Sequence, residues 1–244
     1  MSPKHVVSCS FGKDSIATIL LALEHGEPLD EAVYCEAMFD NSTSGEVPEH
    51  QAFIYQAAIP ALEKLGVPVR VLRSEKTYTS VFMGKVTRGP KKGMIRSFPV
   101  CGKCYVQRDC KMHPIRQYQK TLPSNTVQYI GIAKDEPQRL ARLGGNQVSL
   151  LEKYGYTEDD AKQLCKQAGL LSPVYEFTDR GGCWFCPNAK LSELRHLYDH
   201  HPDLWQKMMR LQIVPGKVTE KFNRNQTFAD IDAMFREWDL QTAA

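Results

Sequence analysis

Five of the eight cysteines lie in two short, glycine-containing stretches of the 244-residue chain. Cys101 and Cys104 form a C-x2-C pair with Cys110 six residues further on, and Cys183 and Cys186 form a second pair in RGGCWFCPN. A C-x2-C turn places two thiolates about 4 Å apart, so that one metal can bind both, and two such turns complete four-fold coordination. The spacing predicts a metal centre but leaves zinc and an iron–sulfur cluster open, because both accept four thiolates.

A second stretch whose residues could do chemistry is SFGKDS, residues 10–15. It joins a β-branched run to a helical pattern with almost no loop between them. The amides of a first helical turn have no partner within the helix, and the helix dipole adds partial positive charge, so such a turn attracts phosphate. Gly12 lets the backbone approach a ligand closely, and Lys13 adds a charge. The structural alternative is a well-capped helix with Asp14 at its start. The candidate phosphate-binding residues are Ser10, Phe11, Gly12, Lys13, Asp14 and Ser15.

Apolar, β-rich runs alternate with longer helical patterns along the first part of the chain. Strands are predicted at 5–10, 31–40, 67–74 and 126–133. Helices are predicted at 14–25 and at 48–66, the second bent at Pro60. This alternation predicts an α/β fold with an open parallel sheet and helices on both faces, because parallel strands need crossover connections.

The remaining segments depart from that pattern. Residues 84–115 are rich in Gly, Lys, Pro and Cys and are expected to form an insertion outside the sheet. After about residue 150 the pattern is mostly helical, with a helix pair expected around Pro202. The expected domains are a nucleotide-binding domain with the cysteine cluster at 1–190 and a helical extension packed on it at 191–244.

SFGKDS resembles the pyrophosphate loop of the adenine nucleotide α-hydrolase, or PP-loop ATP pyrophosphatase, superfamily. Three further stretches resemble its phosphoadenylylsulfate (PAPS) reductase-like branch, in the order in which that branch has them: FDNSTSGEVPEHQAFI at 39–54, CKMHPI at 110–115 and GIAKDEPQR at 131–139. Together the matches span residues 5 to about 190. The resemblance implies an adenine nucleotide, ATP or a relative, bound across the carboxyl ends of the strands.

The resemblance also assigns residues outside the loop. Asp40, at the end of the second strand, would lie near the adenosine, and the backbone of Gly131 and Ile132 would pass the nucleotide. Asp135, Glu136 and Arg139 would close the site from the fourth strand. With Lys13 and Asp14, these last three are the candidate catalytic residues.

For the cysteines, the resemblance favours a [4Fe–4S] cluster, with zinc as the alternative. Assimilatory adenylylsulfate reductases hold such a cluster on a Cys-Cys pair before the K…P segment and on a later C-x2-C. The later pair has a counterpart in Cys183 and Cys186, but the adjacent Cys-Cys is absent. Cys104 and Cys110 are expected to complete the set, with Cys101 as a substitute ligand or a reactive thiol.

PAPS reductases use a nucleophilic cysteine in a C-terminal ECGxH segment, and no cysteine follows Cys186 in this chain. The leading interpretation is therefore ATP pyrophosphatase chemistry coupled to sulfur transfer. The enzyme would adenylate an acceptor oxygen, with magnesium expected beside the triphosphate and nucleic acid as one candidate acceptor. The alternatives are a sulfonucleotide (PAPS or adenylylsulfate) reductase with a relocated nucleophile such as Cys101, and a non-catalytic nucleotide-binding protein with a structural zinc.

Charge and hydropathy give information about possible partners and location. A net charge of +3 does not by itself indicate a nucleic-acid or membrane partner. No apolar run approaches the roughly 18–20 residues that span a bilayer, and MSPKH lacks the apolar core of a signal peptide. A cytoplasmic protein with no membrane partner is expected. The sequence leaves the sulfur donor, the sulfur acceptor and the oligomeric state undetermined.

Overall fold

The computed structural model describes residues 3–100 and 104–242, and the chain forms two compact units that interleave along the sequence. The first unit comprises Met1–Glu36, Val47–Arg73 and His113–Gly181, and the second comprises Ala37–Glu46, Ser74–Met112 and Gly182–Ala244. The sequence places a boundary between residues 190 and 191, whereas the nearest division between the units falls between residues 181 and 182. The second unit combines most of the cysteine-rich insertion with the C-terminal helices.

The first unit is built on a five-stranded sheet in the order β3-β2-β1-β4-β5, and every neighbouring pair is parallel. Its strands are β1 (His5–Ser8), β2 (Glu31–Glu36), β3 (Val69–Arg73), β4 (Val127–Ile130) and β5 (Gln147–Val148). The four predicted strands and the parallel arrangement are confirmed. The fifth strand was not predicted, because two residues are too short to show a period of two.

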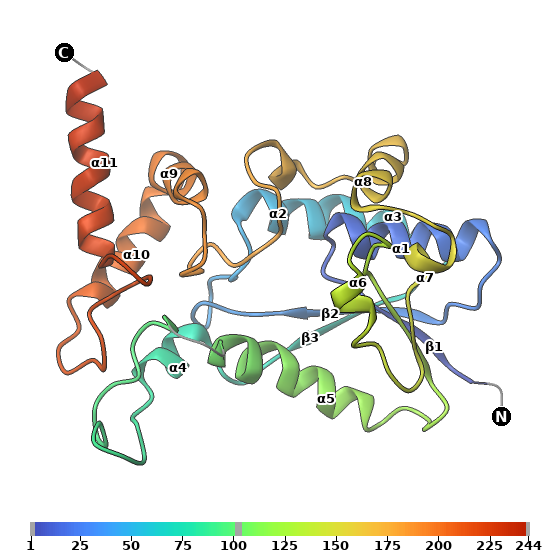
Figure 1. Cartoon of the computed structure of the whole chain (residues 1–244), viewed down its shortest axis with the longest axis horizontal. Helices are drawn as coiled ribbons and strands as arrows, with labels where there is room; N and C mark the ends of the chain where they lie inside the picture. The colour runs from blue at the N-terminus through green and yellow to red at the C-terminus, as the bar shows by residue number, and fades with distance from the viewer. Residues whose placement is uncertain (1–2, 101–103, 243–244) are drawn as a thin grey trace. The chain divides into compact units, whose positions relative to one another are not determined.

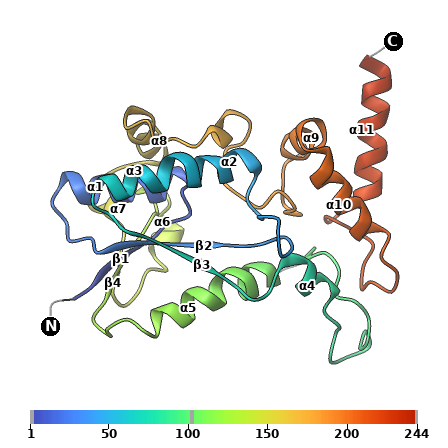
Figure 2. The ribbon, with the colours of Figure 1, turned by 180° about the vertical axis from the view of Figure 1, so that it is seen from behind.

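Helices cover both faces of this sheet, as predicted. Helices α1 (Lys13–Glu24), α3 (Ile59–Lys64) and α8 (Glu158–Gln167) lie on one side, and α5 (His113–Gln119) lies on the other (Figures 1 and 2). The short helices α6 (Pro137–Leu140) and α7 (Leu150–Lys153) follow β4 and β5. The core under α1 consists of fully buried apolar side chains such as Ile16, Ile19 and Leu62.

The helical pattern predicted at 48–66 is continuous but changes its winding. It begins as α2 (Pro48–Phe53), widens to a π-helical segment η1 (Ile54–Ala58) and continues as α3. Pro60 lies in the first turn of α3 and cannot donate a hydrogen bond to the preceding turn. The wider π turn just before it accommodates this lost hydrogen bond.

The short 3-10 helix η3 (Pro173–Glu176) also belongs to the first unit, and the second unit contains further helices. They are α4 (Tyr78–Met83), the π-helical segment η2 (Gln107–Met112), α9 (Leu191–His200), α10 (Pro202–Gln212) and α11 (Phe228–Thr242). The predicted pair around Pro202 is confirmed, with the proline at the first position of α10, where its missing N–H costs no hydrogen bond. Trp205 is buried, its ring lies tilted against Phe228 with centroids 4.2 Å apart, and its Nε1 donates to Asp232 at 2.7 Å. None of the described helices combines the length and the apolar character that a membrane span requires.

Candidate functional site

The turn between β1 and α1 is held in shape by Phe11. This residue has a φ of 59°, in the left-handed region that non-glycine residues rarely adopt, and its side chain is fully buried. The Phe11 ring meets Tyr34 edge-on, with centroids 5.1 Å apart. The Phe11 side chain therefore anchors the loop in the core, and only its backbone can face a ligand.

Some of the amides at the start of α1 donate to acceptors within the chain, and others do not. The Lys13 amide donates to the Tyr175 hydroxyl at 2.9 Å, and the Ser15 amide donates to the Gly12 carbonyl at 3.1 Å. The amides of Gly12 and Asp14 donate to no acceptor in the part of the chain that the structure describes. Open donors at the positive end of a helix can form a cradle for an anion, so these two amides are called the cradle below.

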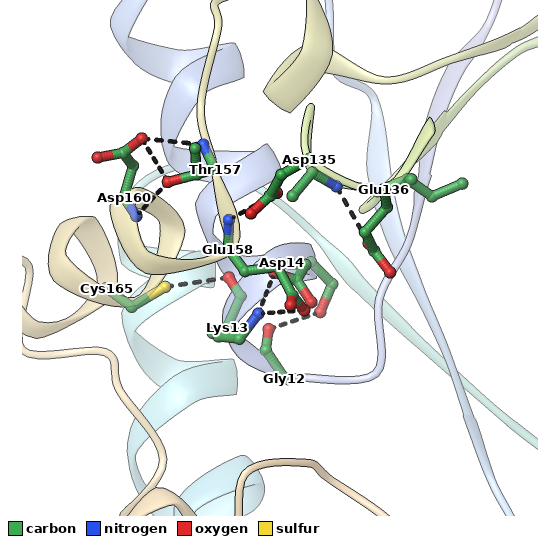
Figure 3. Close-up of polar contacts among 12 residues, drawn as sticks. Gly12, Lys13, Asp14, Asp135, Glu136, Thr157, Glu158, Asp160 and Cys165 are labelled. Carbon is green, nitrogen blue, oxygen red and sulfur yellow. Dashed lines mark hydrogen bonds and ion pairs between the residues drawn. The ribbon is translucent and has the colours of Figure 1, made fainter. Parts of the chain in front are cut away.

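Lys13 carries its charge at this cradle between two carboxylates. Its Nζ lies 2.7 Å from Oδ1 of Asp14 and 3.0 Å from Oε1 of Glu158 (Figure 3), although only 9% of the residue is exposed. Burial lowers the pKa of Lys13, but the hydrogen bonds to the two carboxylates outweigh it and raise the pKa overall. Burial raises the pKa of Asp14, and Lys13 opposes that rise. Lys13 therefore remains an ammonium ion at neutral pH.

The Ser15 hydroxyl holds the turn together through two hydrogen bonds. It donates to the Gly12 carbonyl at 2.9 Å and accepts from the Ser10 amide at 3.3 Å, so both ends of the turn are tied to one side chain. The Ser10 carbonyl in turn lies 3.2 Å from Nε2 of His50, whose Nδ1 is 2.8 Å from the Ser172 hydroxyl. The predicted hydroxyl ligands thus divide into a bracing residue, Ser15, and an exposed one, Ser10.

The end of β4 lies directly against the start of α1. A Cβ atom on Gly131 would come within 2.8 Å of the Asp14 carbonyl carbon and 2.9 Å of the Ser15 nitrogen. Only glycine allows this approach, so Gly131 brings β4 beside the cradle. The next residue, Ile132, is buried, and its carbonyl accepts from the Ser149 hydroxyl at 2.6 Å.

The predicted acidic residues after β4 lie in the part of the unit that contains Asp14. Each of them is bound to another residue of the chain. Asp135 accepts from the Glu158 amide at 3.1 Å and so caps α8 (Figure 3). Arg139 is paired with Glu136 at 2.5 Å. The charges of Glu136 and Glu158 both raise the pKa of Asp14, which places these carboxylates within electrostatic reach of it. Glu158 was missed by sequence reasoning because its acidic run, EDD, indicates only a helix start.

Asp40, expected near the adenosine, belongs to the second unit and is paired there. Its Oδ2 lies 2.6 Å from Nζ of Lys207, and its Oδ1 accepts from the amides of Ser42 and Thr43 at 2.9 and 2.7 Å. Burial alone would raise its pKa, but Lys207 and the two amides hold the pKa of Asp40 well below its ordinary value. No sequence pattern pointed to Lys207, which lies 167 residues away.

Four of the five predicted metal-ligating cysteines lie together in the second unit, and Cys101 lies outside the described residues. The Cys186 amide donates to the Cys183 carbonyl at 3.0 Å, which closes the C-x2-C turn. Burial raises the pKa of Cys183 to about 12, with Cys186 and Cys104 adding to it. Burial likewise raises the pKa of Cys110 to about 11, with Asp109 and Cys104 adding. The two segments therefore meet, and their thiols interact electrostatically.

The two residues between Cys183 and Cys186 anchor that turn. Trp184 donates through Nε1 to the Ser44 carbonyl at 2.8 Å, and the Phe185 ring stacks on Tyr78 with centroids 4.1 Å apart. A Cβ atom on Gly45 would come within 3.1 Å of the Phe185 ring, so a glycine is needed beside it. The aromatic pair in RGGCWFCPN thus fixes the turn to the unit's core.

One buried polar group beside these cysteines bears on what they could hold. The Tyr78 hydroxyl is fully buried with no hydrogen-bond partner among the described residues. Burial, followed by Tyr105 and three cysteines, raises the pKa of Tyr78, which places this orphan donor near the thiols. A sulfur-rich group would supply the acceptor that it lacks.

Among solved structures, this chain is similar to the U34-tRNA thiolase NcsA from Methanococcus maripaludis with its [4Fe-4S] cluster. The two are 14% identical with a TM-score of 0.43, over 88% of this chain and 74% of that chain. No protein-family model and no curated protein matches the sequence. The function proposed below therefore rests on the residues of this chain.

Proposed function

We propose that this chain is an adenine-nucleotide-dependent sulfurtransferase of the PP-loop, PAPS reductase-like kind. The observation that carries this proposal is the cradle at the start of α1, where two unpaired amides lie beside the buried ammonium of Lys13. An ammonium group has three N–H donors, and Asp14 and Glu158 take two of them. The third donor and the amides of Gly12 and Asp14 would hold phosphate oxygens.

Magnesium is expected with the nucleotide for reasons of charge. Glu136 and Glu158 act on Asp14, and Asp135 caps the helix that carries Glu158. Lys13 and Arg139 compensate only two of these four carboxylates. A triphosphate adds further negative charge, and Mg²⁺ prefers carboxylate and phosphate oxygens, so the ion would make binding favourable.

The proposed reaction has two steps. In the first, an oxygen of the acceptor attacks the α-phosphorus of ATP, a new P–O bond forms, the bond to the β-phosphate breaks, and pyrophosphate leaves. In the second, a sulfide-class nucleophile attacks the acceptor carbon, the C–O bond breaks, and AMP leaves with the oxygen. The amides of the cradle and Lys13 would stabilise the negative charge that builds on the phosphates.

Cys104, Cys110, Cys183 and Cys186 would hold a [4Fe–4S] cluster in the second unit. Such a cluster, when bound, would supply a metal site at which sulfide can be held for transfer. The chain's own contribution is to position the four thiols: Trp184 and Phe185 anchor one pair, and the burial of Cys110 shields a ligand from solvent.

The test is pyrophosphate release from Mg·ATP by anaerobically purified protein, with binding measured by calorimetry. Lys13→Met is expected to weaken ATP binding about 10- to 100-fold, because a hydrogen bond to a charged group contributes roughly 1.5–3 kcal/mol. Asp159→Asn is the matched control, since Asp159 is exposed in the first turn of α8. Iron and acid-labile sulfide are measured in the same samples.

The outcomes separate the alternatives. Pyrophosphate release that depends on Lys13 supports adenylation chemistry. Sulfite release from PAPS or adenylylsulfate would instead identify a sulfonucleotide reductase. ATP binding that is equal in Lys13→Met and Asp159→Asn would mean that the turn is only a capped helix start, and the proposal would fail. One zinc per chain without iron would exclude the cluster.

A further inference from the structure

Two loops of the second unit, called the basic loops below, lie side by side. The first, residues 84–96, follows α4, and the second, residues 216–226, follows α10 (Figures 1 and 2). The Ile95 amide donates to the Gly216 carbonyl at 2.9 Å, and the Val218 amide donates to the Ile95 carbonyl at 2.8 Å. Side chains of both loops can therefore contact one ligand.

The basic loops concentrate the positive charge of the chain. They contain eight basic residues and one acidic residue, whereas the whole chain contains 31 and 28 and has a net charge of +3. The rest of the chain therefore carries a net negative charge. The eight basic residues are Lys85, Arg88, Lys91, Lys92, Arg96, Lys217, Lys221 and Arg224. Such a cluster of one sign of charge is typical of a surface that binds a polyanion.

Most of these charges have no carboxylate beside them. Of the eight, Arg96 and Lys217 lie within 4.0 Å of a carboxylate among residues 3–100 and 104–242. The other six form no ion pair within those ranges and are exposed. Elsewhere in the same unit, Arg108 lies 2.7 Å from Asp109. The uncompensated charges of the basic loops repel one another, and a polyanion would relieve that repulsion.

The backbone of the basic loops is fixed before any ligand binds. The first loop is a short hairpin in which the Val86 amide donates to the Met94 carbonyl and the Gly93 amide to the Val86 carbonyl, both at 2.9 Å. The Ser97 hydroxyl, just after it, donates to the Thr219 carbonyl at 2.6 Å. Ser97 has a φ of 73°, which non-glycine residues rarely adopt, and such strain is found where a ligand needs a fixed geometry. Ordering these loops on binding therefore costs little entropy.

Phe222 anchors the second loop and bears on how a ligand is recognised. It is the only aromatic residue in the sequence of the basic loops, and it is fully buried. Its ring meets Phe98 and Phe228 edge-on, with centroids 5.5 and 5.1 Å apart. The basic loops therefore present no ring on which an unpaired base could stack. Positive charge without stacking is suited to the phosphates of a double helix.

We propose that the basic loops form a docking surface for the phosphate backbone of a double-helical nucleic acid. Their six exposed cations contact phosphates, and each contact releases counterions from the helix. The surface adds a partner to the proposed function without resting on it, because neither the cradle nor the cysteines contribute to it.

The experiment uses the full chain, purified anaerobically so that the cysteine site keeps its natural occupant. Fluorescence anisotropy measures binding of labelled DNA and RNA duplexes of two helical turns at several salt concentrations. Single strands of the same length and phosphatidylserine vesicles serve as competitors. The test variant combines Lys85→Gln with Lys92→Gln. The matched control combines Lys64→Gln with Lys120→Gln, two exposed lysines of the first unit, so that both variants lose the same net charge.

Wild type and the control are expected to bind the duplexes with equal affinity. The test variant should bind about tenfold more weakly, and its slope of log affinity against log salt should be smaller by about two, because two phosphate contacts are lost. Circular dichroism checks that both variants are folded.

Equal affinities of the test variant and the control would overturn the proposal. So would the absence of binding to both duplexes, or stronger competition by single strands or vesicles than by unlabelled duplex. ATP binding is measured in the same samples and reports on the cradle alone. A wild-type chain that binds no ATP but shows the difference between the two variants would count against the proposed function and support the docking surface.

Discussion

Lys13 is a buried cation that the first unit keeps charged just beyond the carboxyl end of β1, the central strand of its sheet. Taking an ammonium out of water is costly unless it is paired, and Asp14 and Glu158 provide that pairing at 2.7 and 3.0 Å. A methionine would fill the same space without the electrostatic cost. Retaining the charge is therefore best explained by a ligand that needs it, such as the phosphate proposed here.

Asp40 supports a prediction about pH. Its pKa in the folded chain lies well below the value of about 3.9 in an unfolded chain, so its stabilising effect is complete above that pH and is lost as the pH falls below it. Asp40→Asn is expected to lower the free energy of unfolding by about 1 kcal/mol at pH 7, because the pair with Lys207 is partly exposed. The difference from wild type should shrink towards pH 3.

Tryptophan fluorescence during urea unfolding measures this effect, because Trp184, Trp205 and Trp238 all lie in the second unit. Glu75→Gln is the control, since Glu75 is an exposed carboxylate of the same unit. A difference between Asp40→Asn and wild type that stays constant from pH 7 to pH 3 would contradict the assigned ionisation.

Tyr78 allows a second prediction at this scale. Its hydroxyl is buried without a partner, so Tyr78→Phe should stabilise the metal-free chain by roughly 1–3 kcal/mol. In the cluster-loaded protein the same change removes a hydrogen-bond donor near sulfur, which should lower the cluster's reduction potential. Urea unfolding and a redox titration followed by electron paramagnetic resonance measure the two effects.

Tyr105→Phe is the matched control for Tyr78→Phe. The Tyr105 hydroxyl donates to the Ser97 carbonyl, so its removal leaves a protein acceptor unpaired and should destabilise the metal-free chain. If both variants destabilise the metal-free chain equally, the Tyr78 hydroxyl is not an orphan, and its proposed contact with the cluster has no basis.

The elements that build the proposed nucleotide site depend on one close approach between β4 and α1. Since a Cβ on Gly131 would lie 2.8 Å from the Asp14 carbonyl carbon, Gly131→Ala forces the strand and the helix start apart. The expected cost is roughly 1–3 kcal/mol in the free energy of unfolding, with weaker ATP binding. Circular dichroism melting and calorimetry measure these effects.

Gly144→Ala provides the comparison, because a Cβ at Gly144 meets nothing within 4 Å in the described chain. This variant is expected to keep wild-type stability within about 0.5 kcal/mol and wild-type ATP affinity. Equal melting temperatures for Gly131→Ala and Gly144→Ala would show that β4 does not need to lie so close to α1.

At the scale of the whole molecule, the two proposed ligands belong to different units. The phosphate cradle, Gly131 and Glu158 lie in the first, and the four described cysteines lie in the second. ATP should therefore slow amide hydrogen exchange at residues 11–15 and 131–136, while removal of the cluster should speed exchange at 104–112 and 183–186. Unchanged exchange at 104–112 and 183–186 after cluster removal would contradict the assignment of these cysteines as ligands.

Local patterns were enough to predict the parallel sheet, the tight turn between β1 and α1, the helix pair around Pro202 and the meeting of the two cysteine segments. Each of these depends on a period, a helix end or a short spacing, which neighbouring residues encode. Only the tertiary structure revealed the partners that define the chemistry. Glu158 reaches Lys13 across 145 residues, and Lys207 reaches Asp40 across 167.

The orphan hydroxyl of Tyr78 and the bracing of Ser10 by His50 likewise have no local signature. Such contacts depend on how sheets and helices pack, and packing is decided by the shapes and burial of side chains distant in sequence. The sequence by itself therefore determined which elements this chain forms and which residue types could bind phosphate or metal. The tertiary structure decided which charges, hydroxyls and thiols meet there.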